Sequence, residues 1–134
     1  MQTLSSGEMS VVNEHDIVLS RQAVRRMSQQ QGFSLVDQTK MVTAASELAR
    51  NTVIYGGGGI VKWAMLSDGI KRRLRLTFED KGPGIANLEL AMTDGWSSGK
   101  GLGLGLTGTR RLVNEFEIES IVGVGTRVVI TRWK

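Results

Sequence analysis

The stretch EDKGPGIANLELAMTDGWSSGKGLGLGLTG, residues 79–108, holds nearly half of the chain's 17 glycines, and most of them fall in two clusters. The first cluster is DKGPG at 80–84, and the second is GKGLGLGLTG at 99–108. Glycine loses more backbone freedom on folding than any other residue, so a folded domain keeps such runs chiefly where the main chain approaches a ligand closely. The two clusters therefore predict a ligand site in this part of the chain.

Each cluster favours a different part of a ligand. The first follows a strand-like alternation and begins with Asp80, whose carboxylate can accept a hydrogen bond from an exocyclic amine while glycine backbone lies against a base. This arrangement suits adenine. The second cluster leads into an apolar helical stripe at 106–116, and the unpaired N–H groups of a helix N-terminus favour an anion such as a phosphate chain.

Length and composition limit the class of protein. A chain of 134 residues favours one domain, 1–134, with a core of its own. No apolar run is long enough to span a bilayer, and the first residues lack the basic start and apolar core of a signal peptide. The absence of cysteine excludes disulfides and thiolate metal sites. The sequence therefore predicts a cytoplasmic protein that does not enter the membrane.

The net charge of +4 and the pI near 9.9 raise the question of nucleic-acid binding. The densest basic run, KRRLR at 71–75, lies in a predicted strand in which basic and apolar residues alternate, so the basic side chains point away from the core. With one tyrosine and three phenylalanines, the chain offers few aromatic rings for base stacking. A solvated basic face explains the charge, and no nucleic-acid partner is predicted.

Hydrophobic periodicity predicts the order strand, two helices, two strands, two helices, two strands. Asp16 and Asp37 are the predicted N-caps of the first two helices, and the glycine run at 56–59 ends the second. Because the strands form hairpins, we expect an α+β fold, a two-layer α/β sandwich with a mixed, mostly antiparallel sheet and helices on one face. The predicted strands cover 9–13, 60–66, 70–79, 117–122 and 126–133, and the predicted helices cover 17–30, 85–92 and 106–116, with one more from Asp37 to the glycines.

Glu47 and Asn51 are candidate catalytic residues in the second predicted helix. They are four residues apart, so they lie on one helix face. A carboxamide oxygen is a good ligand for Mg²⁺, and a carboxylate one turn away could take a proton from an attacking hydroxyl. On the pair alone, a plain polar helix face remains the competing interpretation, and only the two glycine clusters downstream give the catalytic one weight.

Two better-known glycine motifs do not fit. Residues 103–108 match the spacing of the dinucleotide-binding GxGxxG, but no strand precedes them and no acidic residue follows about twenty positions later. Residues 95–101 fall one residue short of a P-loop, with Gly101 where serine or threonine should follow the lysine. Neither a dinucleotide fold nor a P-loop is therefore predicted.

Taken in order, the three elements resemble the motifs of the GHKL ATPase/kinase superfamily, whose members bind ATP in the Bergerat fold. ELARN at 47–51 is similar to the N box, DKGPG at 80–84 to the first glycine box, and GLGLG at 101–105 to the second. The ordered set is far more specific than any motif alone, and the resemblance spans nearly the whole chain. It implies ATP and Mg²⁺ as cofactors and an ATP lid at about 87–99.

The resemblance also implies a role for each matching residue. Glu47 would be the general base, Asn51 the Mg²⁺ ligand and Asp80 the residue that recognises the adenine amine. The remaining implied nucleotide-binding residues are Gly82, Gly84, Lys100, Gly101, Leu102, Gly103, Leu104, Gly105 and Thr126.

Within the superfamily the chain looks most like the small serine/threonine kinases of bacterial partner-switching stress-response modules. That likeness implies phosphorylation of STAS-domain antagonist or scaffold proteins, of the RsbS and RsbR type, followed by engagement of a PP2C-type phosphatase or another downstream regulator. The alternative is an anti-sigma factor kinase that sequesters a sigma factor. Those proteins usually have a histidine soon after the N-box asparagine, which residues 52–56 lack. Monomer and homodimer both remain open.

Overall fold

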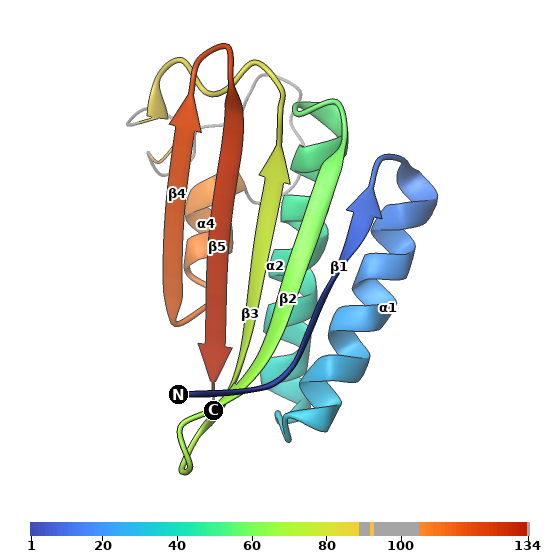
Figure 1. The fold of residues 1–134 in the computed structure, drawn as a ribbon, viewed down its shortest axis with the longest axis vertical. Helices are drawn as coiled ribbons and strands as arrows, with labels where there is room; N and C mark the ends of the chain where they lie inside the picture. Colours follow the sequence, from blue (N-terminus) through green and yellow to red (C-terminus); the bar gives the residue numbers. More distant parts are fainter. Residues whose placement is uncertain (89–91, 93–104, 134) are drawn as a thin grey trace.

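The computed structural model describes residues 1–88, 92 and 105–133, which form one five-stranded sheet with helices on one side (Figure 1). The strand order is β1-β2-β3-β5-β4, and all four neighbouring pairs are antiparallel. This arrangement confirms the predicted α+β sandwich. The elements are β1 (Gln2–Val11), α1 (Glu14–Gln30), α2 (Leu35–Ile54), β2 (Gly59–Ser67), β3 (Arg72–Asp80), α4 (Gly105–Arg110), β4 (Glu115–Ile121) and β5 (Gly125–Trp133).

The core lies between the sheet and the two long helices. On β3, alternate residues point toward the helices, so Leu74 and Leu76 are fully buried and Phe78 nearly so. Leu48 of α2 and Ile130 of β5 belong to the same hydrophobic cluster. Burial of one sheet face therefore fixes the register of β3 and β5, because a shift by one residue would place these side chains in solvent.

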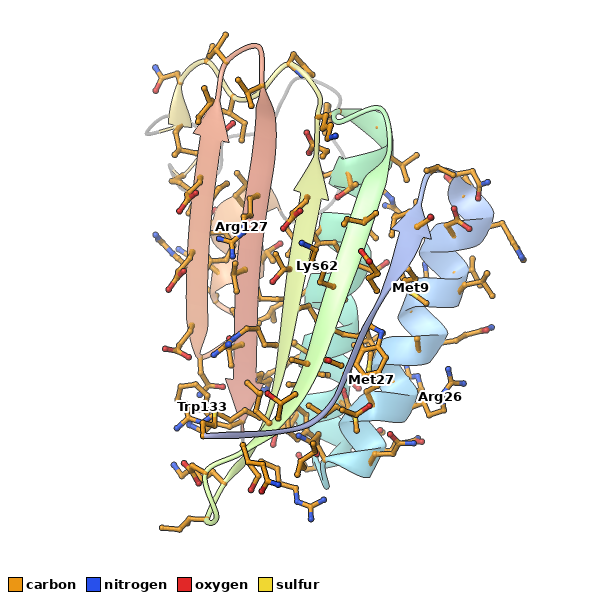
Figure 2. All side chains as sticks on the ribbon, in the orientation of Figure 1. Met9, Arg26, Met27, Lys62, Arg127 and Trp133 are labelled. Carbon is orange, nitrogen blue, oxygen red and sulfur yellow. The ribbon has the colours of Figure 1, made fainter. Side chains whose placement is uncertain are left out.

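The opposite face of the sheet carries the charges. In Figure 2, Lys62 and Arg127 lie on neighbouring parts of this face, and both contact Glu79, at 3.2 and 3.7 Å. The Arg73 guanidinium lies 4.2 Å from the centre of the Trp133 ring. Arg73 and Arg75 thus belong to the face without helices, as the alternation predicts, whereas Arg72 shares the face of Leu74 and Leu76.

The helix caps differ from the prediction. Asn13, not Asp16, caps α1, because its Oδ1 accepts a hydrogen bond from the Asp16 N–H at 2.9 Å. Ser34, not Asp37, caps α2 in the same way, with a distance of 3.1 Å. Each aspartate sits three residues inside its cap, where a carboxylate still interacts favourably with the helix dipole. Both helices therefore begin two to three residues earlier than predicted.

An ion pair between Asp37 and Arg132 connects the start of α2 to β5. Arg132 Nη1 also donates to the Leu112 carbonyl at 2.8 Å, so one guanidinium contacts both α2 and the α4–β4 connection. The Arg132 hydrogen bond lowers the pKa of Asp37 below its usual value, with smaller contributions from Ser34 and Lys40. The pair therefore stabilises the folded state with Asp37 ionised.

The ends of several elements also differ from the prediction. β1 starts at Gln2 rather than near residue 9, and α4 ends at Arg110 rather than near 116, so Phe116 lies in β4. The helix predicted at 85–92 is not helical at 85–87; Leu88 is helical, and 89–91 lie outside the described residues. Most of the lid expected at 87–99 also lies outside them. In the part of the chain that the structure describes, no helix has the length and hydropathy needed to cross a membrane.

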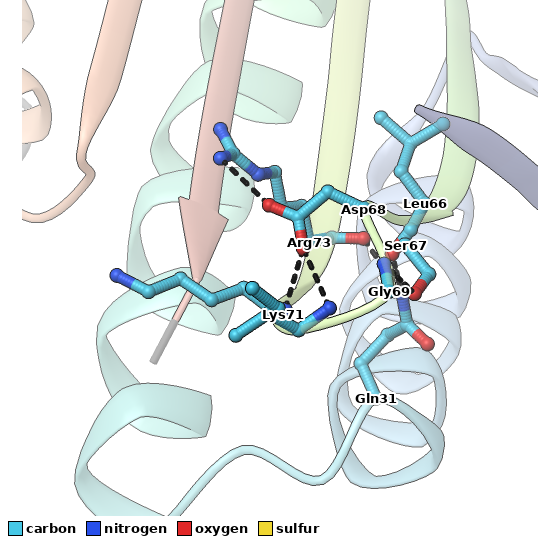
Figure 3. Close-up of polar contacts among 8 residues, drawn as sticks. Gln31, Leu66, Ser67, Asp68, Gly69, Lys71 and Arg73 are labelled. Carbon is cyan, nitrogen blue, oxygen red and sulfur yellow. Dashed lines mark hydrogen bonds and ion pairs between the residues drawn. The ribbon is translucent and has the colours of Figure 1, made fainter.

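A polar cluster closes the end of the sheet where β2 turns into β3 (Figure 3). Asp68 Oδ1 accepts hydrogen bonds from the N–H groups of Ile70 and Lys71, and these bonds lower its pKa. Ser67 Oγ accepts from Gly69 N at 3.1 Å. The buried Gln31 amide donates to carbonyls on both strands, at 3.0 and 2.7 Å, and so fastens the end of α1 to this hairpin.

Candidate functional site

A cavity of about 450 Å³ opens at the other end of the sheet, between the C-terminal half of α2, the end of β3 and the start of β5. Its apolar lining comes from Leu48, Phe78, Pro83, Ile85, Ala86, Leu106 and Val128. Its polar lining comes from Asn51, Thr52, Tyr55, Asp80, Asn87 and Thr126, and the backbone of Gly56, Gly84 and Gly105 completes it. A mostly apolar cleft with a few polar groups is typical of a small-molecule site.

Asp80 is held firmly at the end of β3. Its Oδ1 accepts a hydrogen bond from Gly82 N at 2.9 Å and another from Thr126 N at 3.3 Å. The side chain is half-buried and lines the cavity. The second carboxylate oxygen, Oδ2, receives no hydrogen bond from the described part of the chain. One oxygen thus fixes the group in place, and the other is left to accept a hydrogen bond from a ligand.

Glycines let the backbone come close to Asp80. A Cβ on Gly56 would lie 2.5 Å from the Asp80 Cγ, and a Cβ on Gly82 would lie 2.7 Å from the Gly56 Cα. The chain after α2 and the first glycine cluster therefore pack backbone against backbone around this carboxylate. The sequence predicts only a flexible turn at 56–59, yet Gly56 is required for this close packing.

The loop 81–85 rests on the turn between β4 and β5. Gly84 has a φ of 76°, and a Cβ there would lie 2.5 Å from the Ile121 carbonyl oxygen. The Gly123 N–H donates to the Pro83 carbonyl at 2.8 Å. This contact holds Gly84 at the edge of the cavity. Gly82 does not belong to the described cavity lining. It packs instead against the backbone of Gly56.

Asn51 and Glu47 occupy successive turns of α2. Asn51 lines the cavity, as does Thr52 beside it. Glu47 is half-buried and does not belong to the described cavity lining. Since residues four apart share a helix face, Glu47 lies one turn from Asn51, about 6 Å along the helix axis. The structure thus brings Asn51, Asp80 and Thr126 together, while Glu47 lies outside the described lining.

The expected phosphate side is described only in part. Gly105, with a φ of 70°, begins α4 and lines the cavity. Lys100, Gly101, Leu102, Gly103 and Leu104 lie outside the described residues. Within the described ranges, no group of three or more histidine, aspartate or glutamate side chains could hold a metal.

Several lining residues were not predicted from the sequence. Tyr55 and Ile85 belong to no motif, and only the folded chain places them at the cavity, whereas Asn87 begins the segment expected to form the lid. The one sequence signal for Tyr55 is its position directly before the glycine run that ends α2.

Comparison with known proteins agrees with this geometry. The profile of the family "Histidine kinase-, DNA gyrase B-, and HSP90-like ATPase" matches residues 36–134. The serine/threonine-protein kinase RsbT of Bacillus subtilis is 42% identical over 123 residues, which cover 92% of each chain. An anti-sigma F factor of Clostridium kluyveri is 33% identical over 105 residues, covering 74% of this chain and 72% of the relative.

Solved structures show the same fold. A structure of the RsbU and RsbW domains of a Mycobacterium tuberculosis protein matches 97% of this chain with a TM-score of 0.67 and 20% identity, and the match covers 33% of that longer chain. The mycobacterial sensor histidine kinase MprB matches 96% of this chain and 97% of its own, with a TM-score of 0.56 and 16% identity. The predicted superfamily is therefore confirmed: the chain belongs to the histidine kinase-, DNA gyrase B- and HSP90-like ATPase family, in which it is a homologue of the serine/threonine-protein kinase RsbT.

Proposed function

We propose that this chain, acting as one domain over 1–134, is an ATP-dependent protein serine/threonine kinase that phosphorylates a STAS-domain protein of a bacterial partner-switching module. The single observation that carries the proposal is the meeting of Asn51, Asp80 and Thr126 in one mostly apolar cavity. The likeness to RsbT over 92% of each chain supports the kinase class. ATP would supply the phosphoryl group that is transferred.

The base end of the cavity fits adenine. Apolar side chains and glycine backbone suit a flat ring, and Asp80 Oδ2 can accept from the exocyclic amine while Oδ1 stays bonded to Gly82 and Thr126. A guanine base would place its carbonyl oxygen against Asp80 Oδ2, and two acceptors repel each other. Asp80 would therefore select adenine over guanine, because only adenine offers a donor to the free oxygen of this half-buried carboxylate.

The phosphate end would use Asn51 and the second glycine cluster. Asn51 presents a carboxamide oxygen suited to Mg²⁺, and Gly105, at the start of α4, lines the same cavity. Lys100, Gly101, Leu102, Gly103 and Leu104 are proposed to contact the phosphates. Phosphoryl transfer requires mainly positioning and charge neutralisation from the protein, so a site of this simplicity is sufficient.

Glu47 is the proposed general base. Its place one turn from Asn51, outside the described lining, suits a group that accepts a proton from the hydroxyl of an incoming protein serine or threonine. A residue buried under the nucleotide could not reach such a hydroxyl. Glu47 would then act on the protein substrate and contribute little to nucleotide affinity.

The test is transfer from γ-labelled Mg-ATP to a purified STAS protein. Glu47→Ala should bind ATP within about threefold of the unsubstituted chain yet lose about 100-fold or more of the labelling rate, the usual range for a general base. Glu8→Ala, which removes an exposed carboxylate from β1, serves as the matched control and should label normally. Normal labelling by Glu47→Ala would exclude Glu47 as the base.

The second candidate function is an anti-sigma factor, which the 33% identity to an anti-sigma F factor favours. Partner capture in the presence and absence of Mg-ATP separates the two. Recovery of STAS proteins and a PP2C-type phosphatase would support the switch kinase, whereas recovery of a sigma factor would support sequestration. A cytoplasmic location and the oligomeric state stay predictions, which cell fractionation and light scattering would test.

A further inference from the structure

We propose that Ser120 is a positioning residue for the base end of the nucleotide site. Ser120 is half-buried on β4, directly opposite Thr126 of β5 in the strand register. It does not line the cavity itself and belongs to none of the three family motifs. The inference rests on the proposed function, because the site that Ser120 would organise is the one assigned to adenine.

The contacts of Ser120 connect both sides of that site. Its Oγ accepts a hydrogen bond from Ile85 N at 2.7 Å and lies 2.8 Å from Thr126 Oγ1. Thr126 N in turn donates to Asp80 Oδ1 at 3.3 Å. Ile85, Thr126 and Asp80 all line the cavity. One hydroxyl therefore links the loop after β3 to the threonine and, through its backbone, to the carboxylate.

The Ser120 hydroxyl also fixes the position of the Thr126 hydroxyl. The two oxygens lie 2.8 Å apart, and either can be the donor. Ser120 Oγ also lies 3.4 Å from the Gly125 carbonyl, to which it can donate. A serine has one proton, so when Ser120 donates to Gly125 it accepts from Thr126. In both arrangements Ser120 holds the Thr126 hydroxyl in its place in the cavity lining.

The second effect is on the loop 81–85. Two hydrogen bonds tie this loop to the β4–β5 hairpin: Gly123 N to the Pro83 carbonyl at 2.8 Å, and Ile85 N to Ser120 Oγ. Only the second depends on a side chain. Without the Ser120 hydroxyl, the Ile85 N–H loses its acceptor, and the Ile85 side chain is no longer held against the cavity.

The test is calorimetry with Mg-ATP and Mg-ADP on Ser120→Ala and Ser120→Thr. Ser120→Ala should weaken both nucleotides by about tenfold, the usual effect of one hydrogen bond. The loss should be equal for ATP and ADP, because the change lies at the base end. In the kinase assay, KM for ATP should rise while kcat stays within about twofold. This pattern is expected when a contact that stabilises the bound substrate and the transition state equally is lost. Ser120→Thr keeps the hydroxyl and should restore affinity to within about threefold.

Ser67→Ala is the matched control. Ser67 is also a half-buried serine whose hydroxyl accepts a backbone N–H beside a hairpin, but it lies at the far end of the sheet (Figure 3). It should leave nucleotide affinity unchanged, while thermal melting reports any loss of stability in each variant. Unchanged affinity in Ser120→Ala, equal losses in Ser67→Ala, or no recovery in Ser120→Thr would overturn the inference. Failure of the unsubstituted chain to bind ATP would instead refute the proposed function.

Discussion

Substitution of Gly56 by alanine should damage the nucleotide site while the fold survives. The new Cβ would lie 2.5 Å from Asp80 Cγ and 2.6 Å from Asp80 Oδ2, whereas ordinary contacts of a Cβ begin near 3.4 Å. Gly56 does not have a positive φ, so alanine brings no backbone strain of its own. The Asp80 side chain is therefore the group that must move.

The distances give the size of the effect. To restore an ordinary contact, the carboxylate must retreat by about 0.9 Å, the gap between 2.5 and 3.4 Å. A shift of that size breaks or badly weakens the 2.9 Å hydrogen bond from Gly82 N and the 3.3 Å one from Thr126 N. A hydrogen bond to a charged group contributes about 1.5–3 kcal/mol, so we expect the Kd for ATP to rise by about 10- to 150-fold.

Isothermal titration calorimetry with Mg-ATP measures this change, and circular dichroism and thermal melting report the fold. Gly57→Ala is the matched control: it lies in the same turn, has a φ of 74°, and its Cβ would meet no atom within 4 Å. It should cost about 1 kcal/mol of stability through backbone strain and leave ATP affinity unchanged. A folded Gly56→Ala protein that binds ATP as tightly as the unsubstituted chain would refute the reasoning.

Two further predictions concern stability. Because the Arg132 hydrogen bond lowers the pKa of Asp37, this pair stabilises the fold above the unfolded carboxyl pKa of about 4, and the contribution disappears as the pH falls through the lower folded-state value. Asp37→Asn should therefore reduce Tm at pH 7 and flatten its decline between pH 4 and 2; an unchanged acid limb would contradict this. Leu76→Ala, at a fully buried position, should cost about 2–5 kcal/mol in urea unfolding, and a loss under 1 kcal/mol would contradict the described core.

The sequence predicted the fold well where one face of an element is apolar. The pattern Leu74, Leu76, Phe78 identified β3 and its buried face, and the hairpins around 67–69 and 123–125 identified the antiparallel sheet. The first half of β1 escaped prediction because its residues are mostly exposed and polar, so no alternation marks them. Pairing with β2, rather than local pattern, makes that segment a strand.

The site was predicted as far as its motifs extend. Asp80, Gly84 and Thr126 could be found from spacing and resemblance, since each stands in or beside a glycine turn. Gly56 and Ser120 could not. Their importance comes from contacts across the chain, with Asp80 in one case and with Ile85 and Thr126 in the other, and no local pattern encodes such a contact.

The position of β5 has a consequence for how the activity is acquired during folding. This strand is the last of the five in the sequence, yet it lies inside the sheet (Figure 1). Among the described strands it is the only hydrogen-bonded neighbour of β4, and it carries Thr126. An intermediate in which only β1, β2 and β3 are paired would end at β3, without the strand that brings Thr126 to the cavity. Nucleotide affinity and the pairing of β5 with β3 should therefore appear in the same kinetic phase of folding. Bound ATP should slow unfolding, because it stabilises the state in which β5 is paired.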